Sequence, residues 1–293
     1  MPRTRRLVSL VLLLASFIVP ALSAHAEPAI WIVKGPHATV YLFGTIHALS
    51  KDQPWHSPKI DAAIKDSGTL YLEVPNVDDS AAMQPLIMQL GMDPAHPLST
   101  KLTADQLAKL SKVATAAGFP GGESTLEPFK PWLAALTLSI LPLMKAGYDP
   151  SSGVELELKP EFDKANKPVK GFETAQQQMH YFDDMTEKAQ VDFLAAELDD
   201  FDASVEKFKK LLVAWYDGNV DALDQFNNAE LRDKYPDLFQ LLVVKRNQAF
   251  TTQIQTLLKS DGVTFVAIGA GHLVGKDGVP AMLEKQGYKV TRE

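Results

Sequence analysis

Short apolar runs lie near both ends of the chain and flank a long middle section with a different pattern. Each run is rich in β-branched or aromatic residues, which is typical of buried strands. Gly35, Pro36 and His37 separate the first two runs, so we expect a hairpin there. The helix-like segment 58–65 predicts a crossover from this hairpin to the third run. The expected strands are 29–34, 39–43, 69–74, 168–172, 263–268 and 288–291.

The middle section has apolar residues three and four positions apart, which predicts helices. Thr174 and Gln177 have the pattern of a capping box. Pro142 predicts a kink in the apolar helix 132–144. Because strands at both ends enclose helices, we predict one α/β domain over 27–293, with a central mixed β-sheet built from N- and C-terminal strands and a large helical insertion. Further helices are expected from 174 towards 200 and over 204–216, 220–231 and 236–260.

The segment 1–26 has the pattern of a secretory signal peptide. Arginines precede the apolar run 7–22, and small residues offer a cleavage site before Glu27. A membrane anchor is the alternative, but the run is shorter than the ~20 residues of a typical span. Arg5 and Arg6 hint at twin-arginine export, whereas their flanking residues favour the general route. We predict an exported protein, periplasmic or secreted, without a stable membrane span after cleavage.

Composition excludes several classes of function. The 293 residues contain 29 Lys plus Arg against 36 Asp plus Glu, a formal net charge of −7. Basic residues form no block after the N-terminal segment, so nucleic acid is not an expected partner. The absence of cysteine excludes disulfides, thiolate zinc sites and cysteine nucleophiles. The motifs HExxH and GxSxG and the glycine-rich phosphate and dinucleotide loops are also absent.

Ionisable residues stand at the ends of four predicted strands. His47 and His272 each follow a glycine by three positions, and Glu73 and Glu173 end or directly follow their strands. In open α/β sheets the ligand crevice lies beyond the carboxyl ends of the strands. Glycine at these points lets the backbone turn sharply or approach a ligand closely. We therefore expect the four side chains to converge.

Two imidazoles and one or two carboxylates suit a divalent metal such as Mn, Co or Zn. One hypothesis makes His47, Glu73, His272 and Glu173 the ligands of an ion that lowers the pKa of a bound water. In the alternative, the histidines are hydrogen-bonded structural residues and Glu173 stabilises the start of the next helix. Ring nitrogens and carboxylate oxygens within about 3–5 Å of one another would allow a shared ion, whereas separations above about 8 Å would argue against it.

Three other charged residues have two interpretations each. Glu155 and Glu157 alternate in GVELEL, a pattern typical of a solvated face, although Glu155 has the option of pointing inward. Arg246 is either a surface cation or, on a buried helix turn, a group that binds a substrate carboxylate or stabilises an oxyanion.

The ordered segments VYLFGTIHAL, TLYLEVP, GVELEL, KPVKGFETAQQQ, KRNQAF and FVAIGAGHLVG resemble the TraB/GumN family, which includes PrgY and the Tiki-type proteins and is distantly similar to erythromycin-esterase (EreA) and ChaN-like proteins. The resemblance covers nearly the whole chain after residue 26. It implies an EreA/ChaN-like α/β fold with His47, Glu73 and His272 as the active constellation. Glu155 and Arg246 fall in further family-like segments, as does Glu173. For the Tiki branch, the resemblance implies metal-dependent peptide cleavage.

These observations leave three functions. The first is an exported metal-dependent, peptidase-like hydrolase that acts on a peptide or small molecule, with Mn, Co or Zn bound by His47, Glu73 and His272 and with Arg246 holding the substrate's charge. The second is a metal-independent, esterase-like hydrolase with a strand-end histidine as general base and a glutamate that orients it. The third is a protein that binds a peptide or haem in the same cleft without catalysis.

Overall fold

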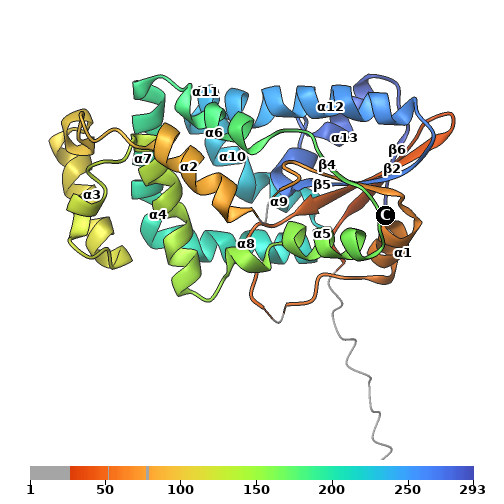
Figure 1. Ribbon diagram of the computed structural model, residues 1–293, viewed down its shortest axis with the longest axis horizontal. Helices are drawn as coiled ribbons and strands as arrows, with labels where there is room; N and C mark the ends of the chain where they lie inside the picture. Colours follow the sequence, from red (N-terminus) through yellow and green to blue (C-terminus); the bar gives the residue numbers. More distant parts are fainter. Residues whose placement is uncertain (1–26, 52, 77–78) are drawn as a thin grey trace, which may run out of the picture.

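The computed structural model describes residues 27–51, 53–76 and 79–293 (Figure 1). The predicted signal peptide, 1–26, lies outside the described residues. A six-stranded mixed sheet with the strand order β4-β3-β5-β2-β1-β6 forms the centre of the fold, which confirms the predicted α/β class. Its strands are β1 (Ile30–Lys34), β2 (Ala38–Thr45), β3 (Thr69–Leu72), β4 (Val169–Gly171), β5 (Gly262–Gly269) and β6 (Val290–Arg292).

The sheet combines the predicted hairpin with a parallel section. Strands β1 and β2 pair antiparallel, with Ile30 opposite Phe43. Gly35 allows this hairpin to pack closely, because a Cβ there would lie 1.9 Å from the backbone oxygen of Leu258. Strands β2, β5, β3 and β4 are parallel neighbours. Their carboxyl ends therefore meet at one edge of the sheet.

Helices cover both sides of the sheet and extend beyond its carboxyl edge. Figure 1 shows α12 and α13 on one side, α1, α5 and α8 on the other, and a helical lobe that includes α3, α4 and α7 beyond the edge. The helices are α1 (Pro58–Asp66), α2 (Ser80–Gly91), α3 (Ala104–Ala117), α4 (Pro131–Lys145), α5 (Val154–Lys164), α6 (Ala175–Asp183), α7 (Glu187–Asp200), α8 (Ser204–Tyr216), α9 (Val220–Asn227), α10 (Ala229–Lys234), α11 (Pro236–Phe239), α12 (Lys245–Leu258) and α13 (Val279–Lys285).

Three helices expected to be continuous are interrupted. The helix predicted from 174 towards 200 is two helices, α6 and α7, because Thr186 caps a new start. The one predicted over 220–231 is divided at Asn228, whose side chain donates to Asp224 and to the Gly271 backbone oxygen. The predicted helix 236–260 contains a π-helical segment, Gln240–Val244, between α11 and α12. The spacing of apolar residues predicted continuous helices. Side-chain hydrogen bonds at Thr186 and Asn228, and the π-helical hydrogen bonding of Gln240–Val244, interrupt them.

The helical lobe has a hydrophobic core of its own, apart from the core around the sheet. Helix α4 contributes Ala134, Ala135 and Leu138 to the lobe, where they pack against Leu194 of α7. Among the described residues, no helix combines the length and apolar character needed to cross a membrane. The lobe lies beyond the carboxyl edge of the sheet, where the predicted site residues are found.

Candidate functional site

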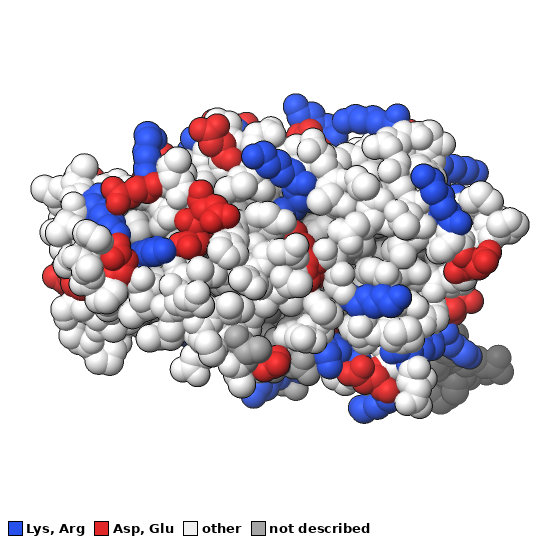
Figure 2. Space-filling model, turned by 45° about the horizontal axis from the view of Figure 1, so that its top comes forward, with Lys and Arg blue, Asp and Glu red and all other residues white. Residues whose placement is uncertain are grey.

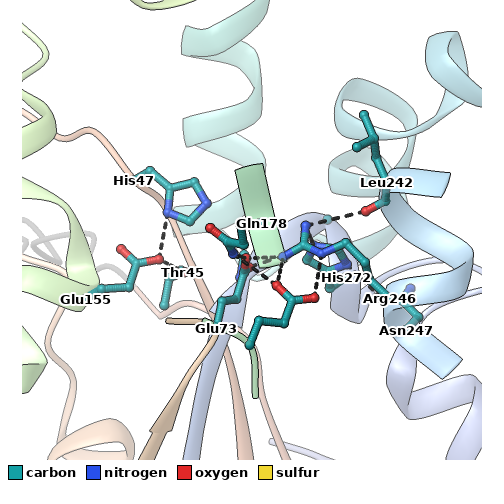
Figure 3. Close-up of polar contacts among 12 residues, drawn as sticks. Thr45, His47, Glu73, Glu155, Gln178, Leu242, Arg246, Asn247 and His272 are labelled. Carbon is teal, nitrogen blue, oxygen red and sulfur yellow. Dashed lines mark hydrogen bonds and ion pairs between the residues drawn. The ribbon is translucent and has the colours of Figure 1, made fainter. Parts of the chain in front are cut away.

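The predicted site residues come from adjacent strand ends. His47 lies two residues after β2, Glu73 directly after β3 and Glu173 two residues after β4. His272 belongs to the single helical turn Ala270–Leu273 that follows β5. Because these four strands are parallel neighbours, the fold brings the four side chains to one region. Figure 3 shows His47, Glu73 and His272 there.

Gly269 marks the point at which three of them meet. A Cβ at Gly269 would lie 3.0 Å from Glu73 Oε1, 3.4 Å from His47 Nε2 and 3.6 Å from His272 Cδ2. The backbone N–H of Gly269 donates to Glu73 Oε1 at 2.7 Å. The second glycine–histidine motif therefore provides both a hydrogen-bond donor and the space in which the side chains gather.

His47 is held by a buried carboxylate that the sequence left ambiguous. Its Nδ1 lies 2.7 Å from Glu155 Oε1, and Thr45 Oγ1 donates to the same oxygen. The His47 side chain is 68% exposed, whereas Glu155 is buried. The Glu155 carboxylate raises the pKa of the His47 imidazole to about 9. Of the two interpretations of Glu155, the structure therefore supports the one in which it points inward. The exposed Glu157 accepts a hydrogen bond from Trp55 Nε1 at 2.6 Å.

Gly153, at the start of α5, makes the contact between Glu155 and His47 possible. A Cβ there would lie 2.6 Å from the His47 backbone oxygen and 3.3 Å from Glu155 Oε2. Val154 also donates its N–H to the Ile46 oxygen at 3.1 Å. The loop that carries His47 thus packs directly against the first turn of α5.

We expect Gly153→Ala to push α5 away from this loop and weaken the Glu155–His47 pair. Overpacking of this kind costs about 1–3 kcal/mol in the free energy of unfolding, which urea denaturation measures. The pKa of His47, followed by NMR, should fall towards 6.5. Gly68→Ala is the matched control, because a Cβ there would meet only the Val263 oxygen at 3.8 Å. Equal effects of the two substitutions would contradict this account.

Arg246 is buried and acts as a brace, which means that it joins Glu73 to Glu173 through hydrogen bonds. It is therefore not the surface cation that one of the two interpretations predicted. Its side chain is 12% exposed and lies over the rings of Tyr181 and Phe250. Its Nε and one NH2 hydrogen donate to Glu173 at 3.0 and 2.7 Å, and NH2 also donates to Glu73 Oε2 at 2.5 Å. The NH1 group donates to His272 Nε2 at 3.1 Å and to the Leu242 oxygen at 3.5 Å. These contacts engage all five N–H groups of the guanidinium, so none is left for the predicted role of holding a substrate's charge.

The buried His272 is neutral in this arrangement. Its Nδ1 lies 2.6 Å from Asn247 Oδ1, an acceptor, so Nδ1 carries the proton and Nε2 accepts from Arg246. Burial and the positive charge of Arg246 lower the pKa of His272 to about 4, against the opposing effect of Glu73. Arg246 and Asn247 are consecutive residues that contact opposite nitrogens of one ring. They lie two and three residues after the π-helical segment.

Glu73 remains ionised although it is buried. Burial would raise its pKa, but His272, Arg246, His47 and the Gly269 N–H together hold the pKa well below its usual range. Glu73 Oε2 also accepts a hydrogen bond from Gln178 Nε2 at 2.9 Å. Because His272 is neutral near pH 7, the positive charge that holds Glu73 ionised there comes from Arg246 and His47.

A cavity of about 290 Å³ opens beside these residues. Glu173, Arg246 and His272 are not among the residues that line it. The apolar residues of its lining are Val74, Pro150 and Leu156. Its polar lining consists of His47, Glu73, Gly153, Glu155 and Gln178.

The four residues predicted to bind a metal do not fit a resident divalent ion as they are arranged here. His272 Nε2 and Glu73 Oε1 are 3.8 Å apart, but His272 Nε2, Glu73 Oε2 and both oxygens of Glu173 accept hydrogen bonds from Arg246. The guanidinium therefore occupies the position that a cation would take. Within the described ranges, the set of three or more acidic and imidazole groups whose ligand atoms all lie within 4.8 Å of one another is instead His180, Asp183 and Asp184.

Several important residues escaped the sequence analysis. Gln178 sits one turn into α6, Thr45 ends β2, and Asn247 follows Arg246. Weak signals existed: the glycine that opens the GVELEL segment, and the capping box that fixes the start of α6, which the structure confirms. None of these patterns indicates a partner across the fold.

Comparison with known proteins agrees with the motifs. The chain is 23% identical to the uncharacterized protein YbaP of Escherichia coli (strain K12) over 257 residues, which cover 87% of this chain and 92% of that protein. It is 24% identical over 287 residues to an uncharacterized protein of Treponema pallidum (strain Nichols), covering 92% and 83% of the two chains. No solved structure gives a significant match. The sequence profile of the TraB/PrgY/gumN family matches residues 29–292, and the chain therefore belongs to the TraB/PrgY/gumN family.

Proposed function

We propose that this protein is an exported hydrolase in which His47 is the general base. The observation that carries the proposal is the pairing of His47 Nδ1 with the buried Glu155 at 2.7 Å. This contact holds the ring so that Nε2 is left for chemistry at the cavity that both residues line. Glu155 is in turn held by Thr45.

The reaction begins with a water beside His47 Nε2. The water oxygen attacks the scissile carbonyl carbon while Nε2 takes up its proton, and the imidazolium then protonates the leaving group as the bond to it breaks. Glu155 keeps the proton on Nδ1 and stabilises the imidazolium charge. Glu73, which lines the same cavity, orients the water by accepting its second hydrogen bond.

The lining indicates the size and kind of substrate. A cavity of about 290 Å³ suits a small ester or a short segment of a peptide, with an apolar group against Val74, Pro150 and Leu156. Basic and acidic side chains are interspersed on the face shown in Figure 2 and form no continuous basic surface there, which supports such a substrate over nucleic acid. Export rests on the sequence pattern of segment 1–26.

The hydrogen bonds from Arg246 to His272, to Glu173 and to one oxygen of Glu73, three of the four predicted ligands, support the metal-independent form of the hydrolase. We expect the purified protein to contain no stoichiometric Mn, Co or Zn by elemental analysis and to keep its activity after chelation. Activity that disappears with a chelator and returns with one of these metals would contradict this form.

If the protein is exported with cleavage of segment 1–26, N-terminal sequencing of the mature chain should give Glu27 as its first residue.

The central test is substitution of His47. The protein is offered p-nitrophenyl acetate and a tryptic digest of casein, with product formation followed by absorbance and mass spectrometry. We expect His47→Ala to lower kcat/KM by about 100-fold or more, because general-base catalysis contributes at least that much. His37→Ala, in the exposed β1–β2 turn, is the control. Binding of peptide without turnover by the wild-type protein would refute the hydrolase and favour a binding protein.

A further inference from the structure

The amide of Gln178 is held in one orientation by two carboxylates. Its Nε2 donates to Glu73 Oε2 at 2.9 Å and to Glu173 Oε2 at 3.1 Å. Ionised carboxylates only accept hydrogen bonds, so the NH2 end of the amide must face them and both of its N–H groups are used. Flipping the amide would place its oxygen against two carboxylate oxygens, which the charges forbid.

The opposite end of this amide faces the cavity. Gln178 lines the cavity together with His47 and Glu73, and Figure 3 shows its amide oxygen on the side towards His47. In the described part of the chain, no donor contacts this oxygen. Gln178 lies on α6, whose start is fixed by the Thr174 capping box, so the oxygen is presented from a rigid element.

The carboxylates beside Gln178 already have roles. Glu73 Oε2 receives hydrogen bonds from Gln178 and Arg246, Glu73 Oε1 receives one from Gly269 and is the acceptor proposed for the attacking water, and Glu155 Oε1 is bound by Thr45 and His47. The oxygen of Gln178 is therefore a neutral acceptor beside the base, without a partner of its own. An amide oxygen of this kind accepts a hydrogen bond from an N–H or O–H group.

We propose that Gln178 is a positioning residue that accepts a hydrogen bond from an N–H or O–H group next to the scissile carbonyl, and so holds that carbonyl beside His47. The preferred substrates then carry a donor at this position, as N-acylated amino-acid derivatives do. This inference rests on the proposed hydrolase function and adds to it a requirement on the substrate.

A matched pair of esters tests the requirement. The p-nitrophenyl esters of N-acetylglycine and N-acetylsarcosine differ by replacement of one N–H with N–CH₃. We expect the wild-type protein to prefer the glycine ester by about three- to tenfold in kcat/KM, the value of one neutral hydrogen bond, after correction for spontaneous hydrolysis. Gln178→Met should lower this ratio to near one. Gln176→Met, an exposed position on the same helix, should leave it unchanged.

The ratio separates positioning from a purely structural role. If Gln178 only braces Glu73 and Glu173, Gln178→Met slows both esters equally and the ratio persists, which would overturn the proposal. If the wild-type protein hydrolyses neither ester, the hydrolase proposal fails for such substrates, and binding of the dimethylamides of the same two acyl groups decides on the acceptor. Selective binding of the N-acetylglycine compound that is lost in Gln178→Met supports the acceptor, whereas equal or absent binding refutes it.

Discussion

Replacing Arg246 by Met is expected to lower the free energy of unfolding by about 3–5 kcal/mol, the usual consequence of removing one partner from a buried ion pair. The substitution leaves Glu73 and Glu173 buried together without the cation that joins them. It also removes the donor to His272 Nε2. The packing of the guanidinium between Tyr181 and Phe250 is only partly replaced by the Met side chain. Urea denaturation measures the loss.

The pH dependence of this loss has a definite sign. In the wild-type protein the pKa of Glu73 is held below its usual range, so the stability that its ionised form contributes is present near neutral pH and is lost only in strong acid. Without Arg246, burial beside Glu173 raises the pKa of Glu73. Proton uptake then relieves the repulsion, so the deficit of Arg246→Met should shrink as the pH falls from 8 to 5.

Two variants serve as controls for Arg246→Met. Arg232→Met breaks an ion pair with Asp224 that is more exposed, and we expect a loss well below that of Arg246→Met. Adding Glu173→Gln to Arg246→Met removes one of the two stranded charges and should restore part of the stability. A loss no larger than that of Arg232→Met, at every pH, would show that Arg246 is not the brace inferred here.

Replacing Glu155 by Gln is expected to move the pH profile of hydrolysis towards acid and to lower its maximum. The base form of His47 has lost its proton, so kcat/KM rises as the pH increases through a pKa of about 9. Glu155 is the chief cause of that raised pKa. With a neutral glutamine the pKa of His47 falls, and we expect the midpoint of the rise to move down by at least one pH unit. The plateau should fall by about 10- to 100-fold because the imidazolium loses its stabilising charge.

Glu157→Gln is the matched control, because this residue lies two positions along the same helix and bonds to Trp55 instead of His47. Its midpoint should stay at the wild-type value. NMR titration of the His47 ring gives the same pKa without substrate and so separates a failure of the pair from a failure of the reaction. An unchanged midpoint in Glu155→Gln would exclude Glu155 as the partner that controls the base.

Much of the site could be predicted from the sequence because many of its residues lie at the ends of strands. Parallel strands that end in GTIH and GAGH place His47 and His272 at one edge, and the same rule brings in Glu73 and Glu173. The hydrogen bonds and ion pairs that these residues form there could be predicted less well. The pattern of a strand predicts the position of a residue along the sheet. The partners of its side chain depend on which helix packs over that edge of the sheet.

The sequence alone determined the α/β class, the six strands and the edge at which the ionisable residues meet, because apolar period and glycine placement are local properties of the chain. Only the tertiary structure decided that Glu155 holds His47, that Arg246 joins Glu73 to Glu173, and that Gln178 turns its oxygen to the cavity. These contacts join residues up to 173 positions apart. Whether a charged side chain is solvated or paired depends on the burial that such packing creates, and no local pattern encodes it.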